Sequence, residues 1–293
     1  MTGILVIGKS GQVAQALALV GGEDVTCLGR SEADLLDPQS LRQALDMHRP
    51  SAVINTGAFT HVDGAESEPE AAYALNVRGT ADLATACAVR NVPLIHLSTD
   101  CVFDGAKAAP YTPQDATNPL GVYGRTKLEG EQAVLGRAPA SLVVRVTWIF
   151  SQFGRNFVRT MLELAKTRPS VRVVRDQYGC PTFAPALAHG LLDMARQIAA
   201  PGFASWGIYH LAGHGSVSRA DMAIKIFELS GQYGGPVAEV IPVATADYPT
   251  PAQRPLNARL DMSDTTRVFG VAPPEWAPGL EQTVDALIKE LSA

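Results

Sequence analysis

The stretch that decides the fold is Ile4-Leu-Val-Ile-Gly-Lys-Ser-Gly-Gln-Val-Ala14, close to the start of a chain of 293 residues. An apolar run ends at Ile7 and leads into a glycine-rich turn, which is followed by the apolar spacing of a helix. A strand, a tight turn and a helix in this order are the context in which such a loop binds the pyrophosphate of a dinucleotide. An ordinary glycine-rich turn between a strand and a helix is the alternative interpretation.

The same alternation of short apolar runs and amphipathic stretches continues to about residue 150. It is typical of βαβ units and a parallel sheet. We expect strands at 4–7, 25–28, 52–55, 94–98 and 141–146, and helices at 12–20, 40–47, 70–90 and 121–135. The sequence therefore predicts an α/β fold built on a Rossmann-type, doubly wound parallel sheet.

The second half of the chain is less regular. Prolines interrupt the alternation at positions 169, 181, 185 and 201, and three more cluster at 249, 251 and 255. Two strong helical patterns remain, at 218–230 and 280–291. We expect residues 1–150 to form an NADP(H)-binding Rossmann domain. Residues 151–293 then form a smaller, mainly substrate-binding lobe, with the chain crossing between the two.

Composition excludes several classes of protein. Apolar residues make up 46% of the chain and the formal net charge is −5, without a basic stripe that would indicate a nucleic-acid partner. The N-terminus lacks the pattern of a secretory signal, and no run approaches the roughly 20 apolar residues of a membrane span. The scattered cysteines, Cys27, Cys87, Cys101 and Cys180, form no zinc or disulfide pattern. We expect a cytoplasmic protein without a metal.

The first turn supplies the phosphate-binding groups of the predicted cofactor site. Gly8 permits the tight turn, Gly11 lets the backbone approach the pyrophosphate, and Ala14 keeps the helix close to the sheet. The helix N-terminus offers free N–H groups and a positive dipole to phosphate. We therefore expect Gly8, Gly11, Gln12 and Val13 to contact a dinucleotide.

The second strand indicates which dinucleotide is bound. It ends in Gly29-Arg30-Ser31, without the carboxylate that NAD-specific sites place at this tip. Arg30, with Lys9, can instead meet a 2′-phosphate, although a solvated Arg30 is the alternative. We therefore expect NADPH, with NADH possible. Asp34 is a candidate to bind the adenine amine, next to Leu35.

Tyr123 and Lys127 are the first candidate catalytic residues. Their i, i+4 spacing places both side chains on one face of a helix. A neighbouring ammonium is expected to lower the phenol pKa from its usual value near ~10. Tyr123 could then protonate the alkoxide that forms when a hydride reduces a ketone, and Lys127 is also placed to hold the nicotinamide ribose, so both are expected cofactor contacts. This spacing also occurs by chance on exposed helices, so the pair needs further support.

The fourth strand supplies that support. It ends in Leu97-Ser98-Thr99-Asp100, at the carboxyl edge of the sheet where α/β folds bind ligands. We expect the Thr99 hydroxyl to hydrogen-bond the substrate carbonyl, with Ser98 in reserve. Either hydroxyl could instead bond only to the backbone.

A set of longer motifs gives the chain a family resemblance. They are Gly8-Lys-Ser-Gly-Gln-Val13, Val62-Asp-Gly-Ala-Glu-Ser-Glu-Pro-Glu70, Ser98-Thr-Asp-Cys-Val-Phe-Asp-Gly105, Tyr123-Gly-Arg-Thr-Lys-Leu-Glu-Gly-Glu131, Arg145-Val-Thr-Trp148, Asn156-Phe-Val-Arg-Thr-Met161, Asp176-Gln-Tyr-Gly-Cys-Pro-Thr182 and Arg254-Pro-Leu-Asn257. With these the chain resembles the extended short-chain dehydrogenases/reductases, and within them the dTDP-4-dehydrorhamnose reductase family. The likeness covers most of the chain.

The resemblance implies hydride transfer from NADPH to dTDP-4-dehydro-L-rhamnose, giving dTDP-L-rhamnose. It implies Thr99, Tyr123 and Lys127 as the catalytic residues. The further cofactor contacts that it implies are Ala58, Thr60 and Asn76. The substrate contacts that it implies are Val102, Phe103, Trp148, Asn156, Thr182, Arg254 and Asn257, of which Phe103 and Trp148 could instead be core residues. We expect a nucleotide-sugar substrate and a monomer or homodimer.

The chain departs from the family pattern at three places. Cys101 stands where the family usually has tyrosine, beside the expected pocket, and Arg259 stands where serine is usual. After the glycine loop, some members have a glutamate that helps hold a magnesium-bridged dimer, whereas this chain has Ala14-Gln15-Ala16. The resemblance therefore implies no such metal here.

Alternative functions remain open at this point. They are another nucleotide-sugar 4-ketoreductase, one of opposite facial selectivity included, an epimerase or dehydratase, and a non-catalytic NADP-binding regulatory subunit. A dehydratase would want an acid directly after the strand hydroxyl, and Asp100 follows Thr99.

Overall fold

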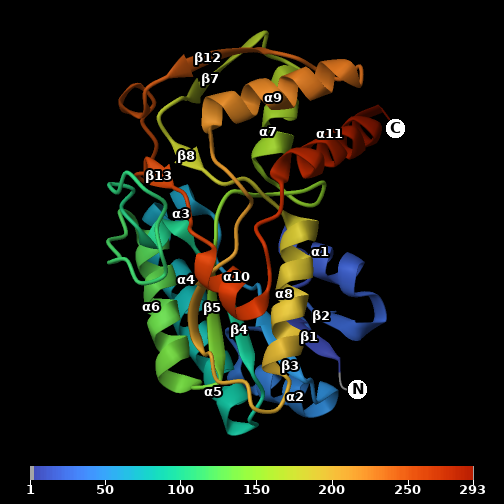
Figure 1. The fold of residues 1–293 in the computed structure, drawn as a ribbon, viewed down its shortest axis with the longest axis vertical. Helices are drawn as coiled ribbons and strands as arrows, with labels where there is room; N and C mark the ends of the chain where they lie inside the picture. Colours follow the sequence, from blue (N-terminus) through green and yellow to red (C-terminus); the bar gives the residue numbers. More distant parts are fainter. Residues whose placement is uncertain (1–2, 293) are drawn as a thin grey trace.

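The computed structural model describes residues 3–292 (Figure 1). At its centre lies a six-stranded sheet in the order β10-β5-β4-β3-β1-β2, all of whose neighbouring strands run parallel. The strands are β1 (Ile4–Ile7), β2 (Val25–Leu28), β3 (Ala52–Asn55), β4 (Leu94–Thr99), β5 (Ser141–Val146) and β10 (Gly207–His210). The five predicted strands are confirmed, and β4 is one residue longer than expected.

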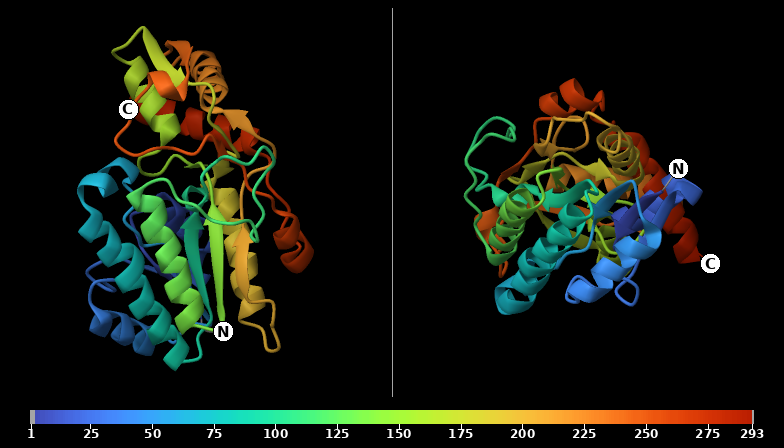
Figure 2. Two further views of the ribbon diagram at one scale, coloured as in Figure 1. Left: turned by 90° about the vertical axis from the view of Figure 1, so that its left-hand side faces the viewer. Right: turned by 90° about the horizontal axis from the view of Figure 1, so that it is seen from below.

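Helices cover both faces of this sheet, because its strands have apolar residues on both sides (Figure 2). Ile4 and Val6 of β1 pack on one face with α1 (Gln12–Gly21) and α8 (Ala184–Ile198). Leu5 and Ile7 pack on the other face with α2 (Pro38–His48), α5 (Thr80–Val89) and α6 (Val122–Arg137). The alternation of side chains along a strand therefore divides the core into two apolar layers.

The predicted helix 70–90 is helical but not uniform. It consists of α4 (Pro69–Tyr73), a π-helical segment η2 (Ala74–Gly79) and α5, and it is preceded by α3 (Val62–Ser67). A Cβ on Gly79 would lie 2.6 Å from the Leu35 carbonyl oxygen, so the segment passes close to the loop after β2. Short 3₁₀ turns lie at η1 (Gly22–Asp24), η3 (Asp100–Val102) and η4 (Thr245–Asp247).

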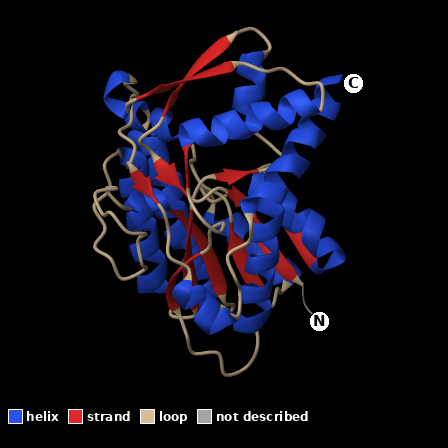
Figure 3. Ribbon diagram, turned by 45° about the horizontal axis from the view of Figure 1, so that its top comes forward, coloured by secondary structure: helices blue, strands red, loops and turns tan. Residues whose placement is uncertain are grey.

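A smaller lobe lies above the carboxyl edge of the sheet (Figure 3). Its core joins α7 (Phe157–Ala165), α9 (Arg219–Gln232) and α11 (Trp276–Ser292) to β7 (Ser170–Val174), which pairs with β12 (Glu239–Val243). Short strands connect the lobes: β6 (Ile149–Phe150) with β9 (Thr182–Phe183), and β8 (Tyr178–Gly179) with β11 (Val217–Ser218) and β13 (Asn257–Ala258). Helix α10 (Ser263–Phe269) lies beside β10.

The second half of the chain is more regular than its prolines predict. The two helices predicted there are confirmed as α9 and α11, and α7, α8 and α10 are present in addition. Pro185 lies in the first turn of α8, where a helix tolerates proline because that N–H has no partner within the helix. Since β10 is a strand of the large sheet and α8 packs on one of its faces, the chain beyond residue 150 contributes to both lobes. Within the described residues, none of the helices combines the length and apolar character needed to cross a bilayer.

Candidate active site

A cavity of about 330 Å³ lies at the carboxyl edge of the sheet. Gln12 and Thr60 follow β1 and β3, Thr99 ends β4, and Tyr123 begins α6. Trp148, Arg219 and Arg254 come from later segments. Parallel strands end at one edge, so residues far apart in sequence meet there. The structure thus brings Thr99 and Tyr123 together, as the sequence predicts.

A glycine determines how closely Tyr123 approaches Thr99. A Cβ on Gly124 would lie 2.2 Å from the Cys101 carbonyl oxygen, so α6 approaches the turn after β4 only because residue 124 lacks a side chain. The helix start is fixed further by Glu66, whose Oε1 accepts a 2.7 Å hydrogen bond from the backbone N of Val122. The Thr99 hydroxyl accepts from the Cys101 backbone N at 3.1 Å and donates to Asp100 Oδ1 at 3.2 Å.

The pKa of Tyr123 differs from the sequence-based expectation. Burial raises it, Cys101 and Asp100 add to the rise, and only the nearby Thr99 hydroxyl opposes it. The expected lowering by Lys127 was wrong, because the lysine side chain points to β4 and the pKa of the phenol is raised. Burial also raises the pKa of Asp100 to about 6, although the Arg219 guanidinium opposes that shift. The phenol is therefore protonated at neutral pH.

Lys127 points behind the cavity rather than into it. Its Nζ donates a 2.7 Å hydrogen bond to the Leu97 carbonyl oxygen and lies 3.3 Å from His96 Nε2. The side chain is buried and does not line the cavity. Ser98, the alternative candidate for the substrate hydrogen bond, already donates a hydrogen bond from its Oγ to Glu131.

A second cavity, of about 190 Å³, lies at the first turn. Six of the predicted cofactor contacts line it: Gly8, Lys9, Arg30, Asp34, Leu35 and Ala58. Gly8 has φ +115°, a backbone conformation that favours glycine, and a Cβ there would lie 2.3 Å from Thr56 Oγ1. Gly11 caps α1 without a side-chain hydrogen bond, so backbone N–H groups of the helix start are open to an anion.

Glu32 corrects one cofactor expectation. The tip of β2 has a carboxylate after all, because a turn brings Glu32 back to accept the Gly29 backbone N–H at 2.9 Å. The same carboxylate pairs with Lys9 at 3.2 Å. Lys9 is therefore already paired, whereas Arg30 is exposed at the cavity.

The remaining predicted cofactor residues have different surroundings. Thr60 lines the larger cavity. So does Gln12, which bonds to the Ile149 carbonyl oxygen at 3.3 Å and to Ser151 at 3.1 Å. Val13 is buried in the core. Asn76 is also buried, and it bonds to both backbone groups of Phe59 and to Thr126. Asn76 thus holds the loop after β3 against α6.

Arg219 is a residue of the cavity that the sequence analysis missed. Its guanidinium carbon lies 3.5 Å from the ring centroid of Trp148 and 5.0 Å from that of Phe157. Burial lowers its pKa to about 10, with Asp100 opposing, so it stays cationic at neutral pH. Arg219 follows the Ser218 cap of α9 and belongs to no motif, so only its position in space reveals it.

A third cavity, of about 180 Å³, continues from the first into the smaller lobe. The two share Gln177, Arg219 and Arg254. Phe157 and Tyr248 supply aromatic walls farther in. Arg254 pairs with Asp63 at 2.9 Å. Together the two cavities form a trough with cationic groups at its middle and aromatic groups at one end.

Five predicted substrate contacts do not line either part of this trough: Val102, Phe103, Asn156, Thr182 and Asn257. Val102 and Phe103 are core residues, and Phe103 stacks on Tyr111 at 4.1 Å. Asn156 caps α7, and Thr182 bonds to the backbone of Cys180 and Gly213. As substrate contacts these residues stay predictions.

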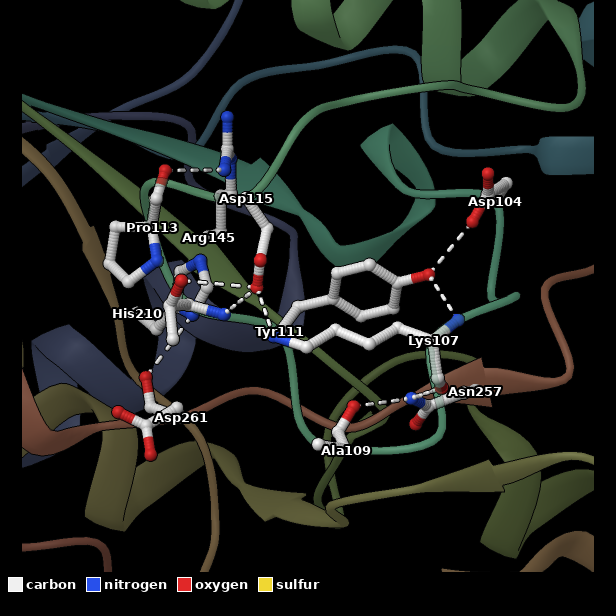
Figure 4. A network of polar contacts seen from close by, with 11 residues as sticks. Asp104, Lys107, Ala109, Tyr111, Pro113, Asp115, Arg145, His210, Asn257 and Asp261 are labelled. Carbon is white, nitrogen blue, oxygen red and sulfur yellow. Dashed lines mark hydrogen bonds and ion pairs between the residues drawn. The ribbon is translucent and has the colours of Figure 1, made fainter.

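Asn257 holds a loop that the close view of the polar network shows (Figure 4). Its Nδ2 donates to the carbonyl oxygens of Lys107 and Ala109, at 2.6 and 2.9 Å. Arg259, where the family usually has serine, donates to Asn257 Oδ1 at 2.8 Å and to the Ala108 carbonyl oxygen. Both side chains thus fasten loop 104–115 to β13.

Comparisons with known proteins identify the family of the chain. A family model described as the RmlD substrate binding domain matches residues 1–289. A dTDP-4-dehydrorhamnose reductase of Sinorhizobium fredii is 41% identical over 290 residues, covering 98% of each chain.

Two solved dTDP-4-dehydrorhamnose reductases share the fold. That of Clostridium acetobutylicum has a TM-score of 0.88 and 32% identity, covering 97% of this chain and 99% of that one. That of Bacillus anthracis, in complex with NADP, has a TM-score of 0.87 and 30% identity, covering 96% and 97%. With a family model and a relative that both span almost its whole length, the chain belongs to the RmlD family, that of the dTDP-4-dehydrorhamnose reductases.

Proposed function

We propose that the protein reduces dTDP-4-dehydro-L-rhamnose (dTDP-6-deoxy-L-lyxo-4-hexulose) to dTDP-L-rhamnose with NADPH, within dTDP-L-rhamnose biosynthesis. The proposal rests on one observation: Thr99 and Tyr123 line a cavity together with Gln12. Gln12 directly follows the turn whose Gly8 and Lys9 line the second cavity. Proton-donating groups and a nucleotide-binding turn therefore meet at one edge of the sheet. Family membership supports the choice of substrate.

The residues at the first turn fit NADPH. The open N-terminus of α1 suits a pyrophosphate, and the exposed guanidinium of Arg30 suits a 2′-phosphate. The relative from Bacillus anthracis was solved with NADP. When bound, the reduced nicotinamide supplies the hydride for C4 of the sugar, and NADH remains possible in that role.

Tyr123 provides the proton that completes the reduction. Its raised pKa keeps the phenol protonated until negative charge develops on the C4 oxygen, which then takes the phenolic proton. The Thr99 hydroxyl turns from its long hydrogen bond with Asp100 to donate to the same oxygen. Lys127 is proposed to hold the nicotinamide ribose once it turns toward the cavity.

The trough suits a nucleoside diphosphate sugar. Arg219 and Arg254 lie where its two cavities join, and guanidinium groups match phosphate oxygens in charge and shape. Trp148 lines the same cavity as Tyr123, where the exposed part of its indole would meet the deoxysugar. Phe157 and Tyr248 line the far end, where the base would lie. We propose Arg219 as a substrate-binding residue on this ground.

The test is incubation of the purified protein with NADPH and the 4-keto sugar nucleotide. Absorbance of the reduced nicotinamide follows the reaction, and NMR identifies the product. We expect dTDP-L-rhamnose. A 6-deoxytalose product would correct the facial selectivity, and no oxidation of NADPH would favour a regulatory NADP-binding protein. Light scattering on the same sample distinguishes a monomer from a homodimer, the two states that we expect.

A further inference from the structure

Behind the cavity, three side chains from different elements form a buried chain of polar contacts. Asn55 ends β3, His96 lies in β4 and Lys127 lies in α6. Asn55 Nδ2 lies 3.1 Å from His96 Nδ1, and His96 Nε2 lies 3.3 Å from Lys127 Nζ. All three residues are at most 2% exposed. Buried polar groups without water must satisfy one another, so the direction of each hydrogen bond matters.

The backbone fixes the orientation of the Asn55 amide. Its Oδ1 accepts a 3.0 Å hydrogen bond from the Gly57 N–H, so its NH₂ group faces His96. A nitrogen that faces an NH₂ donor must accept, and Nδ1 of His96 therefore carries no hydrogen. Burial holds the pKa of His96 well below its ordinary value, so the ring is neutral. A neutral imidazole has one N–H, which in His96 lies on Nε2.

This tautomer determines which hydrogen-bonding group of His96 faces Lys127. The Nε2–H of His96 points at Lys127 Nζ, which itself donates to the Leu97 carbonyl oxygen at 2.7 Å. A neutral amine accepts the first hydrogen bond through its lone pair and donates the second. An ammonium has no lone pair, so it would oppose the imidazole N–H.

We propose that Asn55 and His96 are positioning residues for Lys127: through a fixed imidazole tautomer they favour the neutral amine of its side chain over the ammonium. This inference rests on the proposed function only in treating Lys127 as a residue of the reaction.

The burial of Lys127 shifts its protonation in the same direction. Burial lowers the pKa of Lys127 to about 8, and only Glu131, one turn along α6, opposes the shift. Glu131 is itself engaged by Arg145 of β5, at 2.9 and 2.7 Å. With a pKa of about 8, the Lys127 ammonium still predominates at pH 7, and the neutral amine becomes the main form above about pH 8, where an ordinary lysine stays charged.

The tautomer can be observed directly, without any activity. ¹⁵N NMR of the free protein distinguishes the two neutral imidazole tautomers, and the His96 signals are identified by their loss in His96→Gln. We expect hydrogen on Nε2 and none on Nδ1. Hydrogen on Nδ1 would overturn the proposal. Failure of the reductase assay would leave this measurement unaffected, so the two proposals can fail separately.

A titration of Lys127 tests the consequence. Protein labelled with ¹³C in lysine reports protonation at Cε, and the Lys127 signal is identified by its loss in Lys127→Met. In His96→Gln the amide oxygen can face Nζ and accept from an ammonium, so the midpoint should rise by about one pH unit or more. His210→Gln is the matched control, since His210 is also buried but contacts Asp261 rather than Lys127.

A second variant covers the case in which His96→Gln does not fold. Asn55→Asp places an acceptor opposite Nδ1, which favours the other tautomer and should also raise the midpoint of Lys127. Its ¹⁵N spectrum should then show hydrogen on Nδ1. The proposal would be overturned if the titration midpoint of Lys127 is unchanged in the variants that fold, or if it rises equally in His210→Gln.

Discussion

Tyr123 is an ordinary residue type whose surroundings define its role. It lies at the start of α6 and shares a cavity with Thr99, and burial keeps its phenol protonated. Neither feature can be read from the spacing of Tyr123 and Lys127. The lysine bonds to the Leu97 carbonyl oxygen of β4 and not to the phenol. The two residues therefore share a helix face without sharing a contact.

Replacement of Tyr123 by phenylalanine tests the proton donor. Tyr123→Phe should lower kcat by a large part of the ~10²–10⁴-fold that general acid catalysis contributes, while NADPH binding stays near the wild-type value. Steady-state kinetics and a cofactor titration measure the two effects. Tyr111→Phe is the matched control, because that phenol donates to Asp104 outside the trough. Equal rates for Tyr123→Phe and the wild type would remove Tyr123 from its role.

Asp100 should make stability depend on pH in an unusual direction. Its pKa rises from 3.8 to about 6 on folding, so its contribution is fully present below about pH 4 and is lost as pH rises through 6. The ionised carboxylate then costs of the order of 3 kcal/mol at pH 7. Asp100→Asn should be more stable than the wild type at pH 7 but not at pH 4. Urea unfolding across this range measures it, and parallel curves for the two proteins would contradict it.

At the scale of elements, helix α6 is placed by the glycine that lets it approach the turn after β4. The sequence shows Gly124 between Tyr123 and Lys127 but does not show what lies opposite it. Similarly, Pro185 suggests an interruption of helical structure until its position in the first turn of α8 is known. Local sequence thus predicts whether an element forms better than it predicts where that element packs.

Gly124→Ala tests the close approach of α6. The new Cβ would lie 2.2 Å from the Cys101 carbonyl oxygen, so the helix must move away from Thr99. We expect a loss of about 1–3 kcal/mol in the free energy of unfolding, together with lower activity. Gly136→Ala in the same helix meets nothing within 4 Å and should be neutral or stabilising by about 0.5–1 kcal/mol. Identical effects of the two substitutions would argue against the steric explanation.

At the scale of the whole molecule, a buried ion pair joins the sheet to α6. Arg145 of β5 and Glu131 are both 2% exposed, and Arg145 also donates to the Pro113 carbonyl oxygen of loop 104–115 (Figure 4). Removing one member leaves a buried charge without its partner, which is far more costly than losing a surface pair. The ion pair therefore connects α6 to the sheet and to loop 104–115.

Arg145→Met should reduce the free energy of unfolding by about 3–5 kcal/mol, because Glu131 stays buried and unpaired. Glu290→Ala, which removes the exposed partner of Arg159, should cost no more than about 1 kcal/mol. Denaturant unfolding at neutral pH compares them. Adding Glu131→Gln to Arg145→Met should recover part of the loss, and a double variant as unstable as the sum of the single ones would refute a charge-based cause.

The amino-acid sequence by itself determined the class of fold and the first turn. Short apolar runs and helical periodicity follow from neighbouring residues, so the first five strands of the large sheet and the phosphate loop were predictable. The same holds for Thr99 and Tyr123, since parallel strands must end at a common edge.

Only the tertiary structure decided the rest of the candidate site. Arg219 and Glu32 reach it through folding that no motif marks, and β10 joins the sheet from beyond residue 200. Lys127 contacts His96 because a buried amino group without a hydrogen-bond partner would cost free energy, and His96 is a polar group within reach. Protonation, close approach and the pairing of distant residues depend on neighbours in space, and those exist only once the chain has folded.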